Sequence, residues 1–224
     1  PLDRGALAPD GEALARALLD RALRARLMTV TRVGPAGADR INALLARRAA
    51  DALGEADRAE LAPGTPVMMV ENDYDRGLMN GDQGIILRVR AAAGAPPAEM
   101  AAFPHSRQGQ QGQEDGKLAL YPVATLRGLL EVAYATTVHK AQGSEVDHAA
   151  LILPELDLPL VSRELIYTAV TRARRSMVVV GRRELVEAAV ARPLGRASGL
   201  GERLAARGAL GPSSPPADGA IDER

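Results

Sequence analysis

The sequence predicts an α/β fold, in which a parallel sheet carries a small antiparallel barrel inserted between its strands. Short Val- and Leu-rich runs at 132–138, 148–153 and 177–181 are typical of buried parallel strands. A helical pattern at 162–174 separates the last two runs, as the crossover between parallel strands requires. Within 63–130, short apolar runs alternate with turn clusters, which is typical of a small antiparallel barrel.

The N-terminal segment adds one strand and two helices to the predicted sheet. Residues 11–26 are amphipathic, with Arg residues opposite a single apolar stripe. The stripe consists of Leu14, Leu18, Leu19 and Leu23. A strand at 27–31 and a Gly-Pro-Ala-Gly turn follow, and residues 38–53 then form a second helix. A strand, a glycine-rich turn and a helix in this order indicate an α/β unit.

The pattern changes at Pro63, where short strands and turns begin. Asn80 and Gly81 form a strong tight-turn signal. Residues 91–116 are rich in Ala, Gly and Gln and predict a loose loop. The strands expected in this region are 65–71, 85–90 and 117–121. The expected domain organisation is a sheet domain in two parts, 1–62 and 131–200, an inserted barrel at 63–130, and a disordered tail at 201–224.

Composition excludes several classes of function. Hydrophobic residues are 46% of the chain but aromatic residues only 2%, so base stacking can contribute little to any nucleic-acid binding. Lys plus Arg equals Asp plus Glu at 28 each, so DNA contacts must come from local patches. The chain has no Cys, and its three His do not show metal-ligand spacing, so no metal site is expected.

The chain carries no signal peptide and no apolar run long enough to span a bilayer. We therefore expect a soluble, cytoplasmic protein without membrane contact. The first residue is Pro1 rather than Met, and we expect the chain to be a fragment of a longer protein.

The segment 136–145 gathers varied polar groups where a predicted parallel strand ends. Open α/β sheets bind ligands at this edge. Hydroxyls, a Lys and a Gly that permits close backbone approach suit a phosphodiester, and Glu145 could accept hydrogen bonds from ribose hydroxyls. An ordinary polar connection between two elements would also explain these residues.

The predicted helix 162–174 begins at Ser162, a good N-cap, and buries an apolar stripe. Arg172 lies at the edge of that stripe. An arginine at this place needs a partner anion, and one interpretation is a cation aimed at the terminal phosphate of a nucleotide. The alternative is a surface arginine in a basic helix end, together with Arg174 and Arg175.

Taken together, these stretches resemble a known family. Residues 137–145, Thr-Val-His-Lys-Ala-Gln-Gly-Ser-Glu, resemble motif V of superfamily 1 helicases, and 167–175, Tyr-Thr-Ala-Val-Thr-Arg-Ala-Arg-Arg, resemble motif VI. Residues 28–42 resemble motif IV, and 64–84 resemble the barrel inserted in RecD-type enzymes. The resemblance covers about residues 10–200 and is to the C-terminal part of the RecD family, the exodeoxyribonuclease V alpha chains, with a UvrD-like helicase C-terminal domain.

This resemblance implies a RecA-like, P-loop NTPase-type sheet with an inserted SH3-like β-barrel. It implies that Arg172 contacts the γ-phosphate as a catalytic residue and that Arg32 has a similar duty. Glu145 would lie near the ribose, with Gly143 and Gln142 beside it on the nucleotide side. The cofactor would be ATP with Mg²⁺, both bound mainly by an upstream RecA-like domain that this chain does not contain.

The same resemblance implies that Thr137, His139 and Lys140 contact single-stranded DNA, although His139 could instead be a packing residue. The implied function is ATP-dependent DNA unwinding and translocation in recombinational repair. The implied partners are single-stranded DNA, the upstream domain, and RecB- and RecC-like subunits.

The nucleotide cradle of such enzymes, Gly-x-x-x-x-Gly-Lys-[Ser/Thr], does not occur in the sequence. We therefore expect the chain alone to hydrolyse ATP hardly at all. Two alternatives stay open. One is a non-catalytic module for DNA binding or subunit docking, and the other is a stand-alone RecD-like or relaxase-type helicase.

Overall fold

A computed structural model describes residues 2–3, 6–55, 61–90, 94–104 and 117–192. The predicted tail and most of the predicted loose loop, with His105, lie outside the described residues. No helix within the described ranges is long and apolar enough to cross a membrane.

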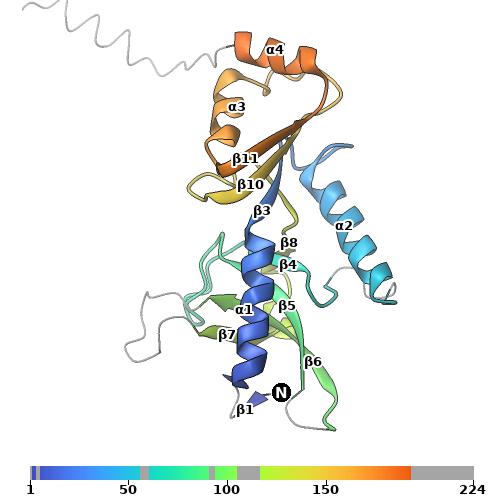
Figure 1. Cartoon of the computed structure of the whole chain (residues 1–224), viewed down its shortest axis with the longest axis vertical. Helices are drawn as coiled ribbons and strands as arrows, with labels where there is room; N and C mark the ends of the chain where they lie inside the picture. The colour runs from blue at the N-terminus through green and yellow to red at the C-terminus, as the bar shows by residue number, and fades with distance from the viewer. Residues whose placement is uncertain (1, 4–5, 56–60, 91–93, 105–116, 193–224) are drawn as a thin grey trace, which may run out of the picture. The chain divides into compact units, whose positions relative to one another are not determined.

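A four-stranded parallel sheet, in the order β11-β10-β3-β9, forms one part of the fold (Figure 1). Every neighbouring pair in this sheet is parallel, which confirms the predicted α/β class. The carboxyl ends of all four strands therefore lie at one edge of the sheet. The strands are β3 (Ala25–Thr29), β9 (Ala135–Thr137), β10 (Val146–Ile152) and β11 (Ala173–Val180).

Helices lie against this sheet, apart from the first, which buries Leu19 against the inserted sheet. The helices are α1 (Pro9–Leu23), α2 (Ala38–Ala52), α3 (Arg163–Val170) and α4 (Arg183–Ala191). Figure 1 shows α3 and α4 together beside β10 and β11. Ser162 caps α3, because its hydroxyl accepts a hydrogen bond from the Leu165 N–H at 3.3 Å. The sequence predicts α3 from this cap and its apolar stripe, but α4 was not predicted.

A second sheet of five antiparallel strands is inserted between α2 and β9, in the order β7-β6-β5-β4-β8. Its strands are β4 (Pro66–Met69), β5 (Gln83–Arg90), β6 (Pro97–Pro104), β7 (Leu118–Pro122) and β8 (Leu130–Val132), with the 3-10 helix η2 (Val123–Leu126) before the last. In the described residues β7 and β8 form the two ends of this order, so the expected SH3-like barrel stays a prediction. A short hairpin of β1 (Leu2–Asp3) and β2 (Ala6–Leu7) begins the chain.

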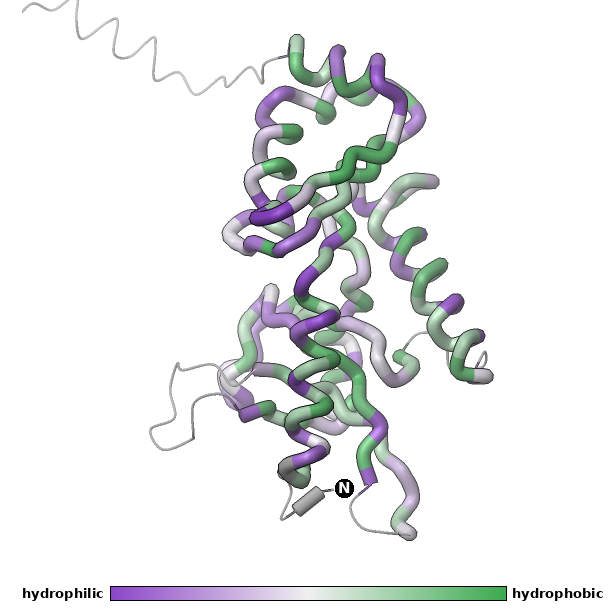
Figure 2. The backbone as a smooth tube through the Cα atoms, in the orientation of Figure 1, coloured by the Kyte–Doolittle hydropathy of each residue, from purple (hydrophilic) through white to green (hydrophobic). Residues whose placement is uncertain are grey.

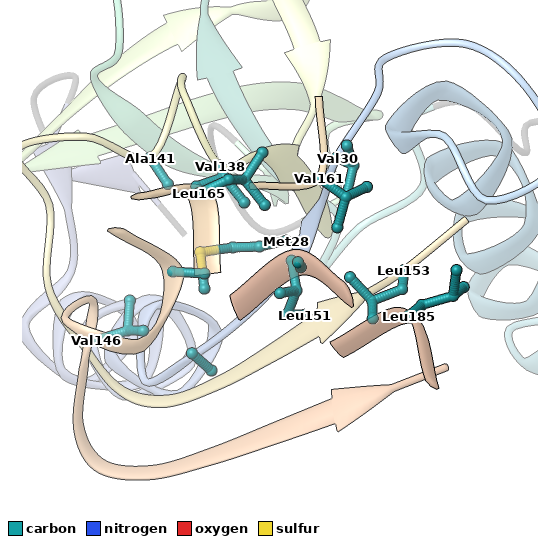
Figure 3. Packing of buried hydrophobic residues seen from close by; sticks show 13 residues of the cluster. Met28, Val30, Val138, Ala141, Val146, Leu151, Leu153, Val161, Leu165 and Leu185 are labelled. Atoms are coloured by element: carbon teal, nitrogen blue, oxygen red, sulfur yellow. The ribbon is translucent and has the colours of Figure 1, made fainter. Parts of the chain in front are cut away.

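Each sheet has its own apolar core. Strands and helices of the parallel sheet converge on Met28, Leu151 and Leu165, which Figure 3 shows among the other side chains of the cluster. The inserted sheet packs around the fully buried Phe103. The core is aliphatic apart from this ring and Tyr121, as the composition predicts. Figure 2 shows the hydrophobic stretches along the strands of both sheets.

Several strands of the structure differ from the predicted ones. The single strand expected at 132–138 is two strands, β8 and β9, because its first part pairs with β4 in the inserted sheet and its second part with β3. The expected loose loop contains β6, which pairs with β5 and β7. The expected sheet is also less buried than predicted, because β11 exposes Val178, Val179 and Val180.

The predicted helix 162–174 was wrong at its end. The helix stops at Val170, and Ala173 already begins β11 in register with Val146. Arg174 and Arg175 therefore belong to a strand and not to a basic helix end. The predicted stripe of α1 was also only partly correct, because Leu19 is buried against the inserted sheet whereas Leu14 and Leu18 are exposed.

Candidate functional site

Three charged side chains meet at the carboxyl edge of the parallel sheet. Arg32 follows the end of β3, Lys140 follows the end of β9, and Glu131 comes from β8 of the inserted sheet. One oxygen of Glu131 lies 2.5 Å from Arg32 Nη2 and the other lies 3.0 Å from Lys140 Nζ. Arg32 also pairs with Asp39 at 3.3 Å. One carboxylate thus bridges two residues that the sequence placed in the site.

The electrostatics of this cluster follow from the ion pairs. Partial burial pushes the pKa of Glu131 upward, but the hydrogen bonds and charges of Lys140 and Arg32 outweigh it and hold that pKa below its ordinary value of 4.5. The same hydrogen bond and charge from Glu131, with a contribution from Asp39, raise the pKa of Arg32. The formal charges of Arg32, Lys140, Glu131 and Asp39 sum to zero.

A pocket of about 180 Å³ opens beside the cluster, between the end of β9, the start of α2 and the edge of the inserted sheet. Arg32, Lys140 and Thr137 line it. Thr136 also lines it. This residue is only 5% exposed, and its hydroxyl has no hydrogen-bond partner in the structure. A buried hydroxyl without a partner costs free energy.

The α2 residue Asn42 fixes the edge of β9. Its side-chain amide donates to the Ala135 carbonyl at 3.0 Å, and its side-chain oxygen accepts from the Ala135 N–H at 2.8 Å. This pair of bonds replaces the missing neighbour strand at the sheet edge. It therefore holds Thr136 and Thr137 in position.

The loop between β9 and β10 is a series of tight turns. The Ala141 N–H donates to the Thr137 carbonyl at 3.0 Å, and the Gln142 N–H donates to the His139 carbonyl at 3.2 Å. Gly143 has a φ of 85°, a conformation that favours glycine. His139, Gln142 and Gly143 are exposed, so His139 is not a packing residue.

Arg172 lies at the other edge of the sheet, in the connection between α3 and β11. Its guanidinium donates to the Thr168 carbonyl at 3.2 Å, the Ser144 carbonyl at 3.2 Å and the Thr171 hydroxyl at 3.3 Å. No carboxylate of the described ranges forms an ion pair with it. Its charge is therefore held in place by neutral oxygen atoms. Glu145, one residue beyond Ser144, is exposed and pairs with Arg174 at 3.0 Å.

The loop thus joins two separate places. Thr137 and Thr29 pair at the carboxyl edge of the parallel sheet, whereas Val146 and Ala173 pair at its amino edge. Because all four strands are parallel, these edges lie opposite each other. The structure brings Arg32 together with Lys140 and brings Arg172 together with the end of the loop, but it does not bring Arg32 and Arg172 together.

The sequence did not single out Glu131 or Asn42, and it placed Thr136 among the polar groups of the segment 136–145 without giving it a role of its own. Their contacts join residues far apart in the chain, such as Arg32 and Glu131 at a separation of 99 residues. One sequence signal could have indicated this cluster: Arg32 follows β3 and Lys140 follows β9, and the carboxyl ends of parallel strands lie at the same edge of a sheet.

Arg26 is a further unexpected residue, a buried arginine on β3 whose guanidinium donates to the Gln83 side chain of β5. Burial lowers the pKa of this arginine to about 10.

The polar turns of the inserted sheet cap their own backbone. Asp82 accepts a hydrogen bond from the Met79 N–H at 2.8 Å, and Asp73 accepts one from the Arg76 N–H at 3.1 Å. Asn80 is held in the same way, because its N–H donates to the Asn72 side chain at 2.8 Å. Asn and Asp side chains commonly bond to the backbone of turns in this way.

Comparisons with known proteins agree on one family. Residues 132–180 match the model of the UvrD-like helicase C-terminal domain. The chain is 36% identical over 183 residues to the RecBCD enzyme subunit RecD of Mycobacterium tuberculosis, covering 82% of this chain and 29% of that protein. It is 33% identical over 192 residues to the ATP-dependent RecD2 DNA helicase of Deinococcus radiodurans, covering 82% of this chain and 24% of that protein.

The chain therefore spans less than a third of the length of these relatives. Among solved structures, a Pif1 helicase from Bacteroides in complex with ADP-AlF3 and single-stranded DNA aligns with 90% of this chain and 51% of that chain. The identity is 17% and the TM-score 0.43, a likeness too low to define the fold.

Proposed function

Because the chain is a RecD-like helicase C-terminal domain, we propose that it is the second, RecA-like motor domain of an ATP-dependent DNA helicase. In this function it supplies an arginine finger to a nucleotide and part of the track for single-stranded DNA. The nucleotide cradle and the Mg²⁺ ligands belong to an upstream domain. The inserted sheet corresponds to the SH3-like barrel of the family.

The environment of Arg172 carries this proposal. An arginine finger must present a positive charge that no carboxylate of its own domain neutralises. The three neutral acceptors of Arg172 meet that requirement, since they orient the guanidinium and no carboxylate of the described residues pairs with it. Such arginines contribute about 10³–10⁵ to the rate of phosphoryl transfer.

The loop 137–145 links the two tasks of the domain. Its first residues, Thr137 and Lys140, face the pocket at the carboxyl edge, where we place the DNA backbone. Its last residues contact Arg172 and Arg174 at the amino edge, where we place the nucleotide. When the cleft closes on the γ-phosphate, Arg172 pulls on the Ser144 carbonyl and shifts the DNA end of the loop.

The test is DNA-stimulated ATP hydrolysis by a protein that contains this chain and the upstream sequence. We expect the Arg172→Ala variant to lose about 10³-fold or more of this activity and to bind single-stranded DNA normally. Arg183→Ala is the matched control. Its side chain is exposed and pairs with Glu187 on the same helix, so we expect a small effect. Unchanged ATPase activity of Arg172→Ala would overturn the arginine-finger assignment.

The chain by itself should show almost no ATPase activity, because the phosphate-binding groups and the metal ligands lie elsewhere. Clear DNA-stimulated turnover by the isolated chain would contradict this. Similarity to both a RecBCD subunit and a RecD2 helicase leaves the assembly to experiment. Co-purification with RecB- and RecC-like subunits favours a role in recombinational repair, and a stand-alone helicase lacks them.

A further inference from the structure

The cluster of Arg32, Lys140 and Glu131 leads to an inference about how the DNA end of the loop is regulated. It rests on the proposed function. A single carboxylate holds both cations, with one oxygen on each, at 2.5 and 3.0 Å. This is the arrangement in which two oxygens of a phosphate would also contact an arginine and a lysine.

The charges of the cluster argue against the cations being free to bind a polyanion. Arg32 and Lys140 contribute two positive charges, and Glu131 and Asp39 contribute two negative charges. A phosphate that approaches this neutral cluster gains little electrostatic attraction. To lie between the two cations it must take the place of the Glu131 carboxylate.

The pocket is suited to receive that phosphate. It lies beside both cations, and Thr136 and Thr137 line it. The amide of Asn42 already fixes the strand that carries Thr136 and Thr137, so this wall of the pocket is held in place.

We propose that Glu131 is a built-in competitor of phosphate at this pocket, and that the phosphate is a phosphodiester of single-stranded DNA. The carboxylate holds Arg32 and Lys140 together when no DNA is present and is displaced when a phosphodiester enters. Because Glu131 lies on β8, the last strand of the inserted sheet, any shift of that strand changes how easily DNA enters. The inserted sheet therefore tunes the affinity of the motor for its track.

The test compares the affinity of the wild-type chain and of Glu131→Gln for an oligothymidylate, measured by fluorescence anisotropy over a range of salt concentrations. Gln keeps the shape of the side chain but removes its charge. We expect binding to tighten by about threefold to tenfold at low salt. We also expect the slope of log affinity against log salt to steepen by about one.

Asp157→Asn is the matched control, because it removes the same charge from an acid that pairs with Arg192 at 2.6 Å elsewhere on the surface. We expect it to leave the affinity nearly unchanged. An equal gain in both variants would reduce the effect to net charge and overturn the proposal. Weaker binding by Glu131→Gln would also overturn it and would identify Glu131 as a residue that positions the two cations.

Two further measurements distinguish a nucleotide phosphate from a DNA phosphate, and the competitor role of Glu131 from the DNA-binding role of the loop. If Glu131→Gln tightens binding of ATP but not of the oligonucleotide, the pocket takes a nucleotide phosphate and the DNA assignment is wrong. Lys140→Ala tests the underlying function. If it leaves oligonucleotide affinity unchanged, the DNA track does not pass here. If Lys140→Ala weakens oligonucleotide binding while Glu131→Gln leaves the affinity unchanged, the result excludes the competitor role of Glu131 but supports DNA binding at this pocket.

Discussion

Arg172 and Arg32 are held in opposite ways, although family resemblance gives both of them a duty at the nucleotide. Arg172 donates to two carbonyls and one hydroxyl, and none of these carries a charge. Arg32 is exposed and pairs with two carboxylates, Glu131 and Asp39. Neutral acceptors orient a cation without cancelling its charge, whereas carboxylates cancel it. The comparison indicates that Arg172 is ready for an anion and that Arg32 first has to exchange one.

The sharpest way to test this difference is to keep the charge and change its shape. In a protein that contains both motor domains, we expect Arg172→Lys to lower ATPase activity by about 10²–10³-fold, because an ammonium cannot reach three oxygens in the geometry of a guanidinium. Arg32→Lys should cost much less, since a lysine can still pair with Glu131. The measurement is steady-state DNA-stimulated ATPase activity. Equal losses in the two variants would remove the distinction between the arginines.

Arg26 tests whether neutral acceptors suffice to hold a buried arginine. Gln83→Leu removes the partner of Arg26, and we expect it to lower the free energy of unfolding by up to about 3 kcal/mol. Arg26→Met removes the cation itself, and we expect it to be neutral or stabilising, because burial already disfavours the charge. Urea denaturation of both variants measures the difference. Strong destabilisation by Arg26→Met would show that the charge has an unseen counterpart.

Asn42 tests how the DNA end of the loop is supported. Asn42→Ala removes both hydrogen bonds to Ala135 and leaves the edge of β9 uncapped, so we expect a loss of about 1–2 kcal/mol of stability. Arg47→Ala is an exposed change on the same helix and should stay within about 0.5 kcal/mol of the wild type. Thermal denaturation compares the two. If both variants behave alike, Asn42 does not hold the edge strand.

The smallest expected effect is a pH dependence at the Arg32 end. The pKa of Glu131 is lower in the folded state than its ordinary value of 4.5, so the stability that it contributes is present above that value. That contribution is lost as the pH falls through the lowered pKa. We expect the free energy of unfolding of the wild type to exceed that of Glu131→Gln by at most about 1 kcal/mol at pH 7. This difference should disappear in acid. A gap that widens in acid would contradict the ion pairs.

Periodicity and end signals predicted the parallel strands and two of the helices well, but their limits depended on tertiary pairing. The predicted helix 162–174 contained Ala173, Arg174 and Arg175, and nothing in their local sequence forbids a helix. They form part of a strand instead, because β11 pairs in parallel with β10. In β6, Ala- and Pro-rich residues of low strand propensity form a strand because β5 and β7 flank them.

The candidate site also contains some residues that the sequence indicated and others that it did not. Motif resemblance directed attention to Arg172 and Lys140, because their residue types recur at fixed spacing. It could not indicate Glu131, which sits on another sheet and becomes relevant only where its carboxylate meets Arg32. Contacts between distant segments depend on the packing of the two sheets, and no local pattern encodes them.

We propose that the loop between β9 and β10 has one end that contacts DNA and another that contacts the nucleotide. The most direct measurement compares single-stranded DNA affinity of Lys140→Ala and Arg172→Ala over a range of salt concentrations. We predict that Lys140→Ala weakens binding and lowers the salt slope by about one, whereas Arg172→Ala leaves both unchanged. Equal weakening in the two variants would contradict the division of the loop.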